Sequence, residues 1–303
     1  MIRRLALAAI FGFVACIATV LWVGSALTAP ANRPVGSPPP ELGASAVAIP
    51  VGSSFVKGWF AQGEPGAGAV LLLHGVRSDR RQMLGRARFL REAGYSVLLI
   101  DLQAHGESPG EHITFGDRER EGVLASLAFL RHELPADPIG VIGVSLGAAS
   151  IVLAHPSPVP DAVVLESMYP SIEAAVSDRL SIRFGAVGAR LAPLLLWQLP
   201  LRLGIPTDRL QPIGAVPTIA APVLFASGTE DQHTTWRETE SIFAAAAEPK
   251  ELWKVPGAAH VDLYKFAPTA YKTKILAFFS TWLRMRPNIN QSFQPTSAAE
   301  LQR

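Results

Sequence analysis

Gly143-Val144-Ser145-Leu146-Gly147 is the stretch of this 303-residue chain that most narrows its fold. It follows the apolar run at residues 139–142 and precedes small residues, beginning with Ala148, that suit the start of a helix. A strand that ends in G-x-S-x-G and opens a helix is a nucleophile elbow, a sharp turn that exposes one serine hydroxyl. The pattern therefore predicts that Ser145 is a nucleophile; the alternative is a serine that only caps the next helix.

Apolar segments on both sides of this turn alternate with helical patterns. We expect strands at residues 47–50, 54–60, 69–73, 95–100, 139–144, 162–165, 222–226 and 252–255. We expect helices at residues 82–93, 116–132, 148–154 and 269–284. Strands that alternate with helices imply an α/β fold with a mostly parallel central sheet flanked by helices. Ligands should then bind beyond the carboxyl ends of the strands.

An apolar insertion interrupts the alternation between the strands that end at Leu165 and begin near Val223. Its large apolar side chains are Leu191, Leu194, Leu195, Leu196, Trp197, Leu199 and Leu201. So apolar a stretch is not expected to be solvated. We expect a helical cap at about residues 167–215 that covers the site and lines an apolar pocket, with additional core as the alternative.

A nucleophilic serine needs a base, and the base needs a carboxylate to orient it. After an elbow of this kind, the acid and then the histidine follow the serine along the chain. His260, in a loop of small residues just past the last strand, is the candidate base. Asp231 is the candidate acid, and its neighbour Glu230 is the main rival. Glu166 is a weaker rival, for which we expect a structural hydrogen bond to a neighbouring turn.

Two backbone amides are expected to form an oxyanion hole. One belongs to Leu146, the residue after the nucleophile. The other is expected in the loop after strand 69–73 and is assigned to Val76. Together these donors would stabilise the negative charge that develops on a carbonyl oxygen.

The other histidines near these motifs fit supporting roles. His74 and His105 are expected to be structural, and His233 is expected to line the entrance of the site. The sequence contains no zinc-binding histidine pattern, cysteine cluster, phosphate loop or dinucleotide fingerprint. We therefore predict no metal and no organic cofactor.

The composition excludes several other classes of protein. Apolar residues make up 49% of the chain and charged residues 17%, which argues against disorder. The net charge is only +2, with no basic stripe, so no nucleic-acid partner is expected. Cys16 is the single cysteine, which excludes an internal disulfide.

The N-terminal residues have the composition that is typical of a membrane-spanning segment. Arg3 and Arg4 precede an uncharged run at residues 5–27, long enough to span a hydrocarbon core of about 30 Å. We expect a single-pass anchor at residues 1–28, with the N-terminus in the cytoplasm and the remainder outside it. A signal peptide cleaved near Ala26, which would release a secreted protein, is the alternative. A proline-rich linker is expected at residues 29–43 and a flexible tail at residues 287–303.

Taken together, these motifs resemble the α/β-hydrolase superfamily. The resemblance rests on Leu72-Leu73-His74-Gly75, Asp101-Leu102-Gln103-Ala104-His105-Gly106-Glu107-Ser108, the elbow, Gly228-Thr229-Glu230-Asp231 and Gly257-Ala258-Ala259-His260. It covers about residues 47–283, within a domain predicted at 44–286. Residues 101–108 look like the branch of monoacylglycerol-lipase-like and serine-aminopeptidase-like hydrolases, although Gln103 departs from the usual arginine. The membrane-tethered BEM46-like group is similar in having an N-terminal span.

The resemblance implies the α/β-hydrolase fold and hydrolysis through an acyl-enzyme on Ser145. The expected substrate is a small-molecule carboxylic ester, and the apolar cap hints at an acyl chain. Three alternatives stay open at this point: a peptidase that holds a free amine with Glu166 or Glu230, an acyltransferase, and a non-catalytic membrane-tethered binding module. The sequence leaves the oligomeric state undetermined.

Overall fold

The computed structural model describes residues 1–284, so the tail predicted at residues 287–303 lies outside the described part. Its core is one eight-stranded sheet with the order β10-β9-β8-β7-β4-β5-β3-β2. The strands are β2 (Ser45–Val51), β3 (Ser54–Ala61), β4 (Ala69–Leu73), β5 (Ser96–Ile100), β7 (Ile139–Val144), β8 (Ala162–Glu166), β9 (Val223–Gly228) and β10 (Lys250–Val255). Only the β2–β3 and β3–β5 pairs of this sheet are antiparallel, which confirms the mostly parallel sheet.

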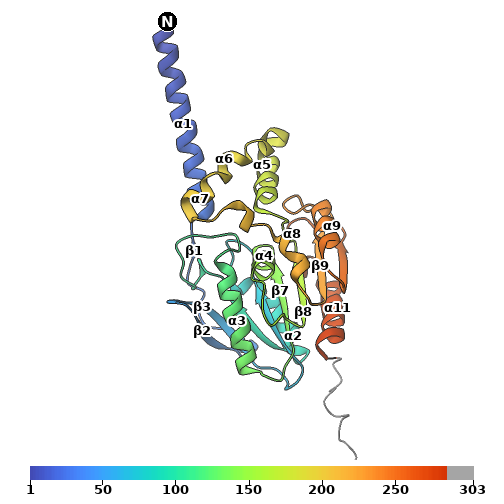
Figure 1. Cartoon of the computed structure of the whole chain (residues 1–303). Helices are drawn as coiled ribbons and strands as arrows, with labels where there is room; N and C mark the ends of the chain where they lie inside the picture. The colour runs from blue at the N-terminus through green and yellow to red at the C-terminus, as the bar shows by residue number, and fades with distance from the viewer. Residues whose placement is uncertain (285–303) are drawn as a thin grey trace, which may run out of the picture.

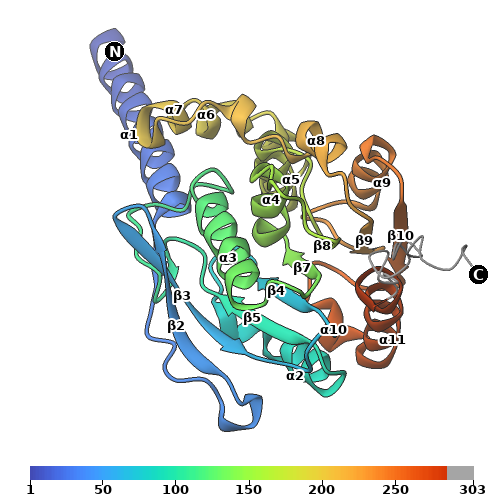
Figure 2. The ribbon, with the colours of Figure 1, turned by 60° about the horizontal axis from the view of Figure 1, so that its bottom comes forward.

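Helices cover both faces of the sheet (Figure 2). One face packs against α3 (Glu119–Glu133), α4 (Leu146–Leu153) and α9 (Trp236–Ala245). The other packs against α2 (Leu84–Glu92), α10 (Leu263–Phe266) and α11 (Pro268–Phe279). The central strands β4, β5, β7 and β8 are buried along their whole length, because helices leave neither face to water. This layering explains why those strands are continuous apolar runs in the sequence.

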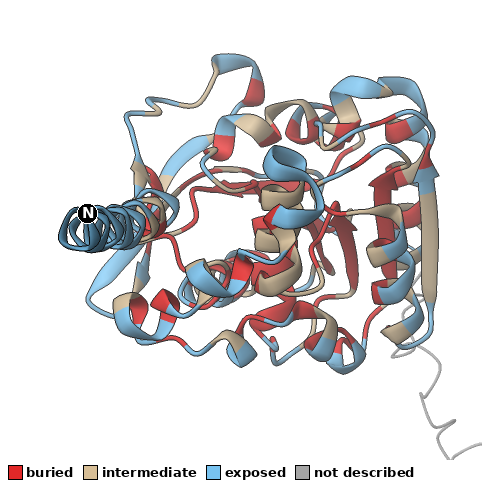
Figure 3. Cartoon of the chain, turned by 90° about the horizontal axis from the view of Figure 1, so that it is seen from above, coloured by how far each residue is buried: buried red, intermediate tan, exposed pale blue. Residues whose placement is uncertain are grey.

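The N-terminal helix α1 (Ile2–Thr28) projects away from the body of the protein (Figure 1). Figure 3, which looks down on the molecule from that side, shows α1 almost entirely exposed. It is the one helix within residues 1–284 that is long and apolar enough by itself to cross a membrane. A helix of this kind near the N-terminus is either a membrane anchor or a signal sequence.

The segment predicted as a proline-rich linker is bound to the sheet domain. Its strand β1 (Ala31–Asn32) pairs in parallel with β6 (His105–Gly106). The backbone amides of Val35 and Gly36 each donate to Glu107 Oε1 at 3.0 Å. These contacts hold the chain close to the domain directly after α1, so the segment is not a free spacer.

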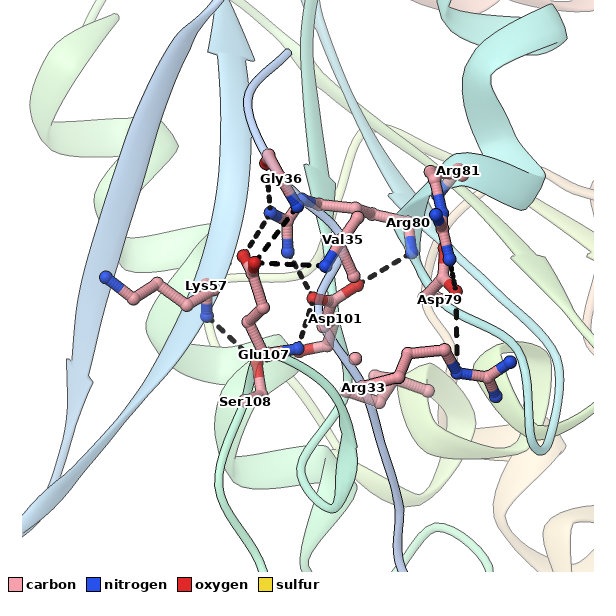
Figure 4. Close-up of polar contacts among 12 residues, drawn as sticks. Arg33, Val35, Gly36, Lys57, Asp79, Arg80, Arg81, Asp101, Glu107 and Ser108 are labelled. Atoms are coloured by element: carbon pink, nitrogen blue, oxygen red, sulfur yellow. Dashed lines mark hydrogen bonds and ion pairs between the residues drawn. The ribbon is translucent and has the colours of Figure 1, made fainter.

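A buried arginine completes this attachment (Figure 4). Arg80 forms ion pairs with the fully buried Asp101 and, at 2.5 Å, with Glu107. Its guanidinium also donates to the carbonyl of Gly36 at 3.1 Å. At the turn that follows Asp101, a Cβ on Gly106 would lie 2.2 Å from the Asp101 carboxylate, so a side chain there would disrupt the network. The Asp101–Ser108 motif thus has a structural role: it joins the linker to the sheet.

The insertion after β8 is helical, as expected. It contains α5 (Ile172–Ala189), α6 (Ala192–Leu196), α7 (Gln198–Leu203) and α8 (Pro212–Ala215). The expectation that its apolar stretch avoids solvent is wrong, since Leu201 is 73% exposed and Trp197 is 50% exposed. The reason is that the small core of the cap uses only one side of these helices. That core consists of Ile172, Leu199, Leu203, Ile205 and Leu210.

Candidate active site

The turn at Ser145 is a strained elbow between β7 and α4. Ser145 has φ +49° and ψ −105°, a conformation that costs free energy for a residue with a side chain. A Cβ on Gly143 would lie 2.6 Å from the backbone nitrogen of Ala148. A Cβ on Gly147 would lie 2.5 Å from the carbonyl oxygen of Leu73. Both flanking glycines are therefore required by close backbone approach.

The Ser145 hydroxyl is buried and has no hydrogen-bond partner within residues 1–284. The backbone of the same residue is firmly held, because its amide donates to the carbonyl of Glu166 at 2.8 Å. A buried hydroxyl without a partner costs free energy, and such groups gather at functional sites. The backbone thus fixes the position of Ser145, while its hydroxyl is left without a hydrogen bond.

Asp231 and His260 are in direct contact at the carboxyl end of the sheet. His260 Nδ1 donates to Asp231 Oδ2 at 2.8 Å. Three more donors saturate this carboxylate, namely the amides of His233 (2.8 Å) and Thr234 (3.0 Å) and the Thr234 hydroxyl (2.9 Å). Burial by itself would raise the pKa of Asp231, but the His260 contact and these hydrogen bonds outweigh it, so the pKa lies below its usual value. The imidazole therefore faces a charged carboxylate in a fixed position.

The loops that carry Asp231 and His260 pack tightly on each other. A Cβ on Gly228 would lie 2.0 Å from the carbonyl oxygen of Ala258, so that position accepts only glycine. Glu230 donates its backbone amide to the same carbonyl at 2.9 Å, and its side chain is exposed. Of the two neighbouring carboxylates, Asp231 contacts the histidine and Glu230 faces solvent.

His233 lies against His260, with the ring centroids 5.1 Å apart. Burial, followed by the charges of His260 and Arg179, lowers the pKa of His233. A neutral ring beside His260 would shield one of its faces from water. The sequence predicts that His233 lies near the site, but it does not predict the ring contact with His260.

The candidate oxyanion amides lie at the same edge of the sheet. Val76 follows β4, which is the neighbour of β7 in the sheet. A Cβ on Gly75 would lie 3.8 Å from the Cβ of Ser145, so this loop runs directly beside the elbow. Within residues 1–284, no hydrogen bond uses the amide of Val76 or that of Leu146. Two free donors thus flank the serine.

Two features expected of the site differ in the structure: one hydrogen bond is missing, and the apolar pocket under the cap lies away from Ser145. The described residues contain no hydrogen bond between Ser145 and His260, although catalytic hydrogen bonds in unliganded enzymes often tighten only when substrate binds. An apolar crevice does lie beneath the cap, but at its junction with α1, with Leu27, Phe115 and Leu195 among its lining residues. Neither Ser145 nor His260 lines it.

His74 and His105 are buried structural histidines. The ring of His74 donates from Nδ1 to the carbonyl of Gly75 (2.7 Å) and accepts at Nε2 from the amide of Leu102 (3.1 Å). His105 packs against it with ring centroids 5.1 Å apart. Burial lowers the pKa of each histidine to about 4. Both rings are therefore neutral at physiological pH and hold the loop that carries Val76.

Because the pKa values of His74 and His105 are lowered in the folded state, we expect the protein to lose stability in mild acid. Their pKa is near 6.5 in the unfolded chain, so the unfolded state binds more protons once the pH falls below that value. The stabilisation is complete above pH 6.5 and declines as the pH approaches 4. At pH 5 the loss should be about 2 kcal/mol for each histidine. Thermal unfolding of the detergent-solubilised chain at pH 7 and pH 5 measures it, and His105→Gln should show a clearly smaller pH dependence. An unchanged dependence would refute the assignment.

The sequence predicts a hydrogen bond from Glu166 to a neighbouring turn. The backbone carbonyl of Glu166 does accept from the elbow at Ser145, but its side chain is bonded to two helices instead. It pairs with Arg86 of α2 at 2.6 Å and accepts a hydrogen bond from the hydroxyl of Tyr271 in α11. The same guanidinium contacts Asp262 at 2.8 Å, two residues after His260. Arg86, Glu166 and Tyr271 are almost fully buried. The network therefore anchors the His260 loop, and Glu166 is not free to hold a substrate amine.

The Arg86 network should be essential for stability. Arg86→Met leaves the buried Glu166 carboxylate without its cation, and such changes cost about 3–5 kcal/mol. Arg88→Met on the same helix is the matched control, because the Arg88–Glu41 pair is about half exposed and solvent screens it, so its loss should change the stability far less. Urea unfolding of both variants tests this difference. Equal losses would show that the buried network contributes no more than a surface pair.

The described residues contain no group of three or more histidine, cysteine, aspartate or glutamate side chains placed to hold a metal ion. The candidate site is therefore described entirely by the side chains and amides named above.

Comparisons with known proteins agree with this architecture. The profile of the alpha/beta hydrolase family matches residues 70–271. An uncharacterized protein of Mycobacterium tuberculosis is 35% identical over 68% of this chain and 68% of its own length. Among solved structures, an esterase of Pyrococcus furiosus has a TM-score of 0.68 at 23% identity, over 84% of this chain and 99% of its own. An esterase of Thermogutta terrifontis has a TM-score of 0.57 at 18% identity, over 79% and 99%. At these identities the structural likeness concerns the fold.

Proposed function

The chain belongs to the alpha/beta hydrolase family, and from this premise we propose that it is a serine hydrolase of carboxylic esters that works through an acyl-enzyme on Ser145. The observation that carries the proposal is the Asp231–His260 hydrogen bond, which lies at the same sheet edge as the elbow serine. The serine hydroxyl is buried and unpartnered, as suits a group kept available for reaction.

The proposed reaction uses the site in two half-reactions. His260 removes the proton of Ser145 as the serine oxygen attacks the ester carbonyl, and then returns that proton to the leaving alcohol. The C–O bond to the alcohol breaks, which leaves the acyl group on Ser145. Water then attacks the acyl-enzyme with His260 again as base, and the free acid leaves. Asp231 keeps the imidazole in one orientation and stabilises its charged form.

The amides of Val76 and Leu146 are the proposed oxyanion hole. Each tetrahedral intermediate carries negative charge on the former carbonyl oxygen, and amides already in position need no reorganisation to stabilise it. Each such donor lowers the barrier by about 2.7–4 kcal/mol in comparable enzymes. The close approach of Gly75 to Ser145 supports this role, because it leaves the loop next to the reacting carbonyl.

We further propose that α1 is retained as a membrane anchor, with the N-terminus in the cytoplasm and the catalytic domain outside it. Arg3 and Arg4 flank the free end of the helix, which favours the cytoplasm for that end. The last turns of α1 are bonded to the domain, since Thr28 accepts from the amide of Ile113 at 2.9 Å. The intact mass of the chain purified from membranes should include residues 1–28. A mature chain that begins near Ala26 would show signal cleavage instead.

Substrate preference separates ester hydrolysis from its rivals. The full-length chain in detergent should cleave p-nitrophenyl esters, and an acyl-chain length series will show whether the protein prefers short or long chains. Aminoacyl-anilides, assayed beside them, should be poor substrates. Activity on the anilides alone would establish a peptidase and overturn the proposal. A fluorophosphonate probe should label the same preparation at Ser145.

A further inference from the structure

The outer face of the cap is apolar and uncovered. Phe184 is 60% exposed, Val187 is 63% exposed and Leu201 is 73% exposed. The other exposed large apolar residues of this segment are Ile182, Leu191, Leu194 and Trp197, so exposed apolar side chains recur along the chain from α5 into α7. An uncovered apolar surface of this extent marks a binding site for protein or lipid.

The cap carries a small excess of positive charge, which favours an anionic partner. Residues 167–215 contain five arginines against the three acidic residues Glu173, Asp178 and Asp208. Arg183 and Arg190 are exposed among the apolar side chains, and neither has an ion-pair partner within residues 1–284. Apolar side chains interspersed with arginine are typical of segments that lie in the interface of a bilayer with anionic lipids.

The helices of the cap are sharply bent relative to each other. Gly185 has φ +62° and interrupts α5, and no atom lies within 4 Å of where its Cβ would be. The segment Ile172–Ala189 bends by 118° relative to Ala192–Leu203, and the two together are apolar enough to enter a membrane. A bend of this size suits a segment that dips into one leaflet and returns.

The cap is attached directly to α1 (Figures 1 and 2). Gln198 donates to the carbonyl of Val20 at 3.0 Å, and Arg202 donates to the carbonyl of Leu21. A Cβ on Gly24 would lie 2.4 Å from the Gln198 amide oxygen, so helix and cap are in van der Waals contact there. These contacts place the cap beside the last three turns of α1.

The position of this contact along α1 agrees with the interface between the hydrocarbon core of a bilayer and its headgroups. The 17 residues from Arg4 to Leu21 rise about 26 Å along a helix, close to the roughly 30 Å of a hydrocarbon core. Arg202 contacts Leu21, and Arg77 donates to the carbonyl of Ala26. Both guanidinium groups would thus lie at headgroup level when α1 spans the bilayer, with the exposed cap surface beside them.

We propose that the outer cap surface, from Ile182 to Leu201, is embedded in the outer part of the same bilayer that α1 spans. The occupant of this surface is the lipid bilayer itself, with a preference for anionic headgroups. Because the cap leaves the carboxyl end of β8, this arrangement turns the candidate active site toward the membrane. The inference rests on the proposed retention of α1 and extends the proposed function, since esters within the bilayer become the natural substrate class.

Site-specific fluorescence tests the contact on the full chain. In a Cys16→Ser background, Phe184→Cys carries an environment-sensitive label on the cap, and His132→Cys is the control. The side chain of His132 is 85% exposed in the last turn of α3, which leads into the amino end of β7, at the edge of the sheet opposite to the cap. Both proteins are reconstituted in vesicles of phosphatidylcholine and phosphatidylglycerol that contain a nitroxide-labelled lipid.

The label at 184 should shift its emission to the blue and lose most of its intensity to the nitroxide, whereas the label at 132 should do neither. Two results would overturn the inference. One is a label at 184 that is as exposed to water as the label at 132. The other is a blue shift without quenching by lipid, which would assign the surface to a second copy of the chain or to another protein. Neither result bears on ester hydrolysis, which is measured separately.

Discussion

Replacement of Ser145 by alanine should lower kcat for a p-nitrophenyl ester by about 10⁶-fold, the size of loss seen when a hydrolytic nucleophile is removed. The substitution deletes one buried oxygen that has no hydrogen-bond partner within residues 1–284, so the folded state loses no hydrogen bond. Labelling by a fluorophosphonate should disappear as well. Melting temperature should be unchanged or slightly raised, because the orphaned hydroxyl is gone.

Ser227→Ala is the matched control for this experiment. Ser227 is also fully buried and also has a hydroxyl without a partner in the described part of the chain, but it lies within β9. Its loss should leave kcat within a few-fold of the wild type. If Ser145→Ala retains wild-type labelling, the elbow serine is not the nucleophile and the proposed mechanism fails.

Asp231→Asn should lower kcat by about 10⁴-fold, because an amide can hold the imidazole in the wrong tautomer and cannot stabilise its charged form. The four hydrogen bonds to the Asp231 carboxylate are all donated by its neighbours, so the asparagine NH₂ would face a donor. The largest effect should fall on the His260 contact, since that ring must become charged during the reaction. Steady-state kinetics with the ester used for Ser145→Ala measures the loss.

Glu230→Gln is the matched control for the acid. It makes the same chemical change one residue away, on an exposed side chain that does not contact His260. Activity of Glu230→Gln should stay close to that of the wild type. A large loss in Glu230→Gln together with a small one in Asp231→Asn would exchange the roles of the two carboxylates.

Much of the fold could be predicted because its signals are local. The strands at residues 69–73 and 139–144 were predicted to the residue, since a buried parallel strand is a continuous apolar run with sharp ends. The glycines of the elbow identify the turn because no other residue fits such close backbone contacts. Chain order then predicted Asp231 and His260 as partners, and the structure brings the two into contact, while their catalytic role stays a prediction.

The Arg86–Glu166 network could not be predicted from the sequence. The two residues are 80 positions apart, and no local pattern distinguishes Arg86 from the exposed Arg88 of the same helix. The pairing exists because β8 and α2 meet on one face of the sheet, which depends on the whole strand order. The correction for Glu166 follows from that three-dimensional proximity.

By itself, the sequence determined the alternation of strands and helices, the elbow at Ser145 and the residues available as its partners, because those features depend on local backbone requirements and chain order. Only the tertiary structure decided which carboxylate meets His260 and which is taken up by Arg86. It also decided that the apolar cap faces outward beside α1. An apolar side chain is equally suited to a protein core and to lipid, so composition cannot choose between them; the packing of the neighbouring elements does.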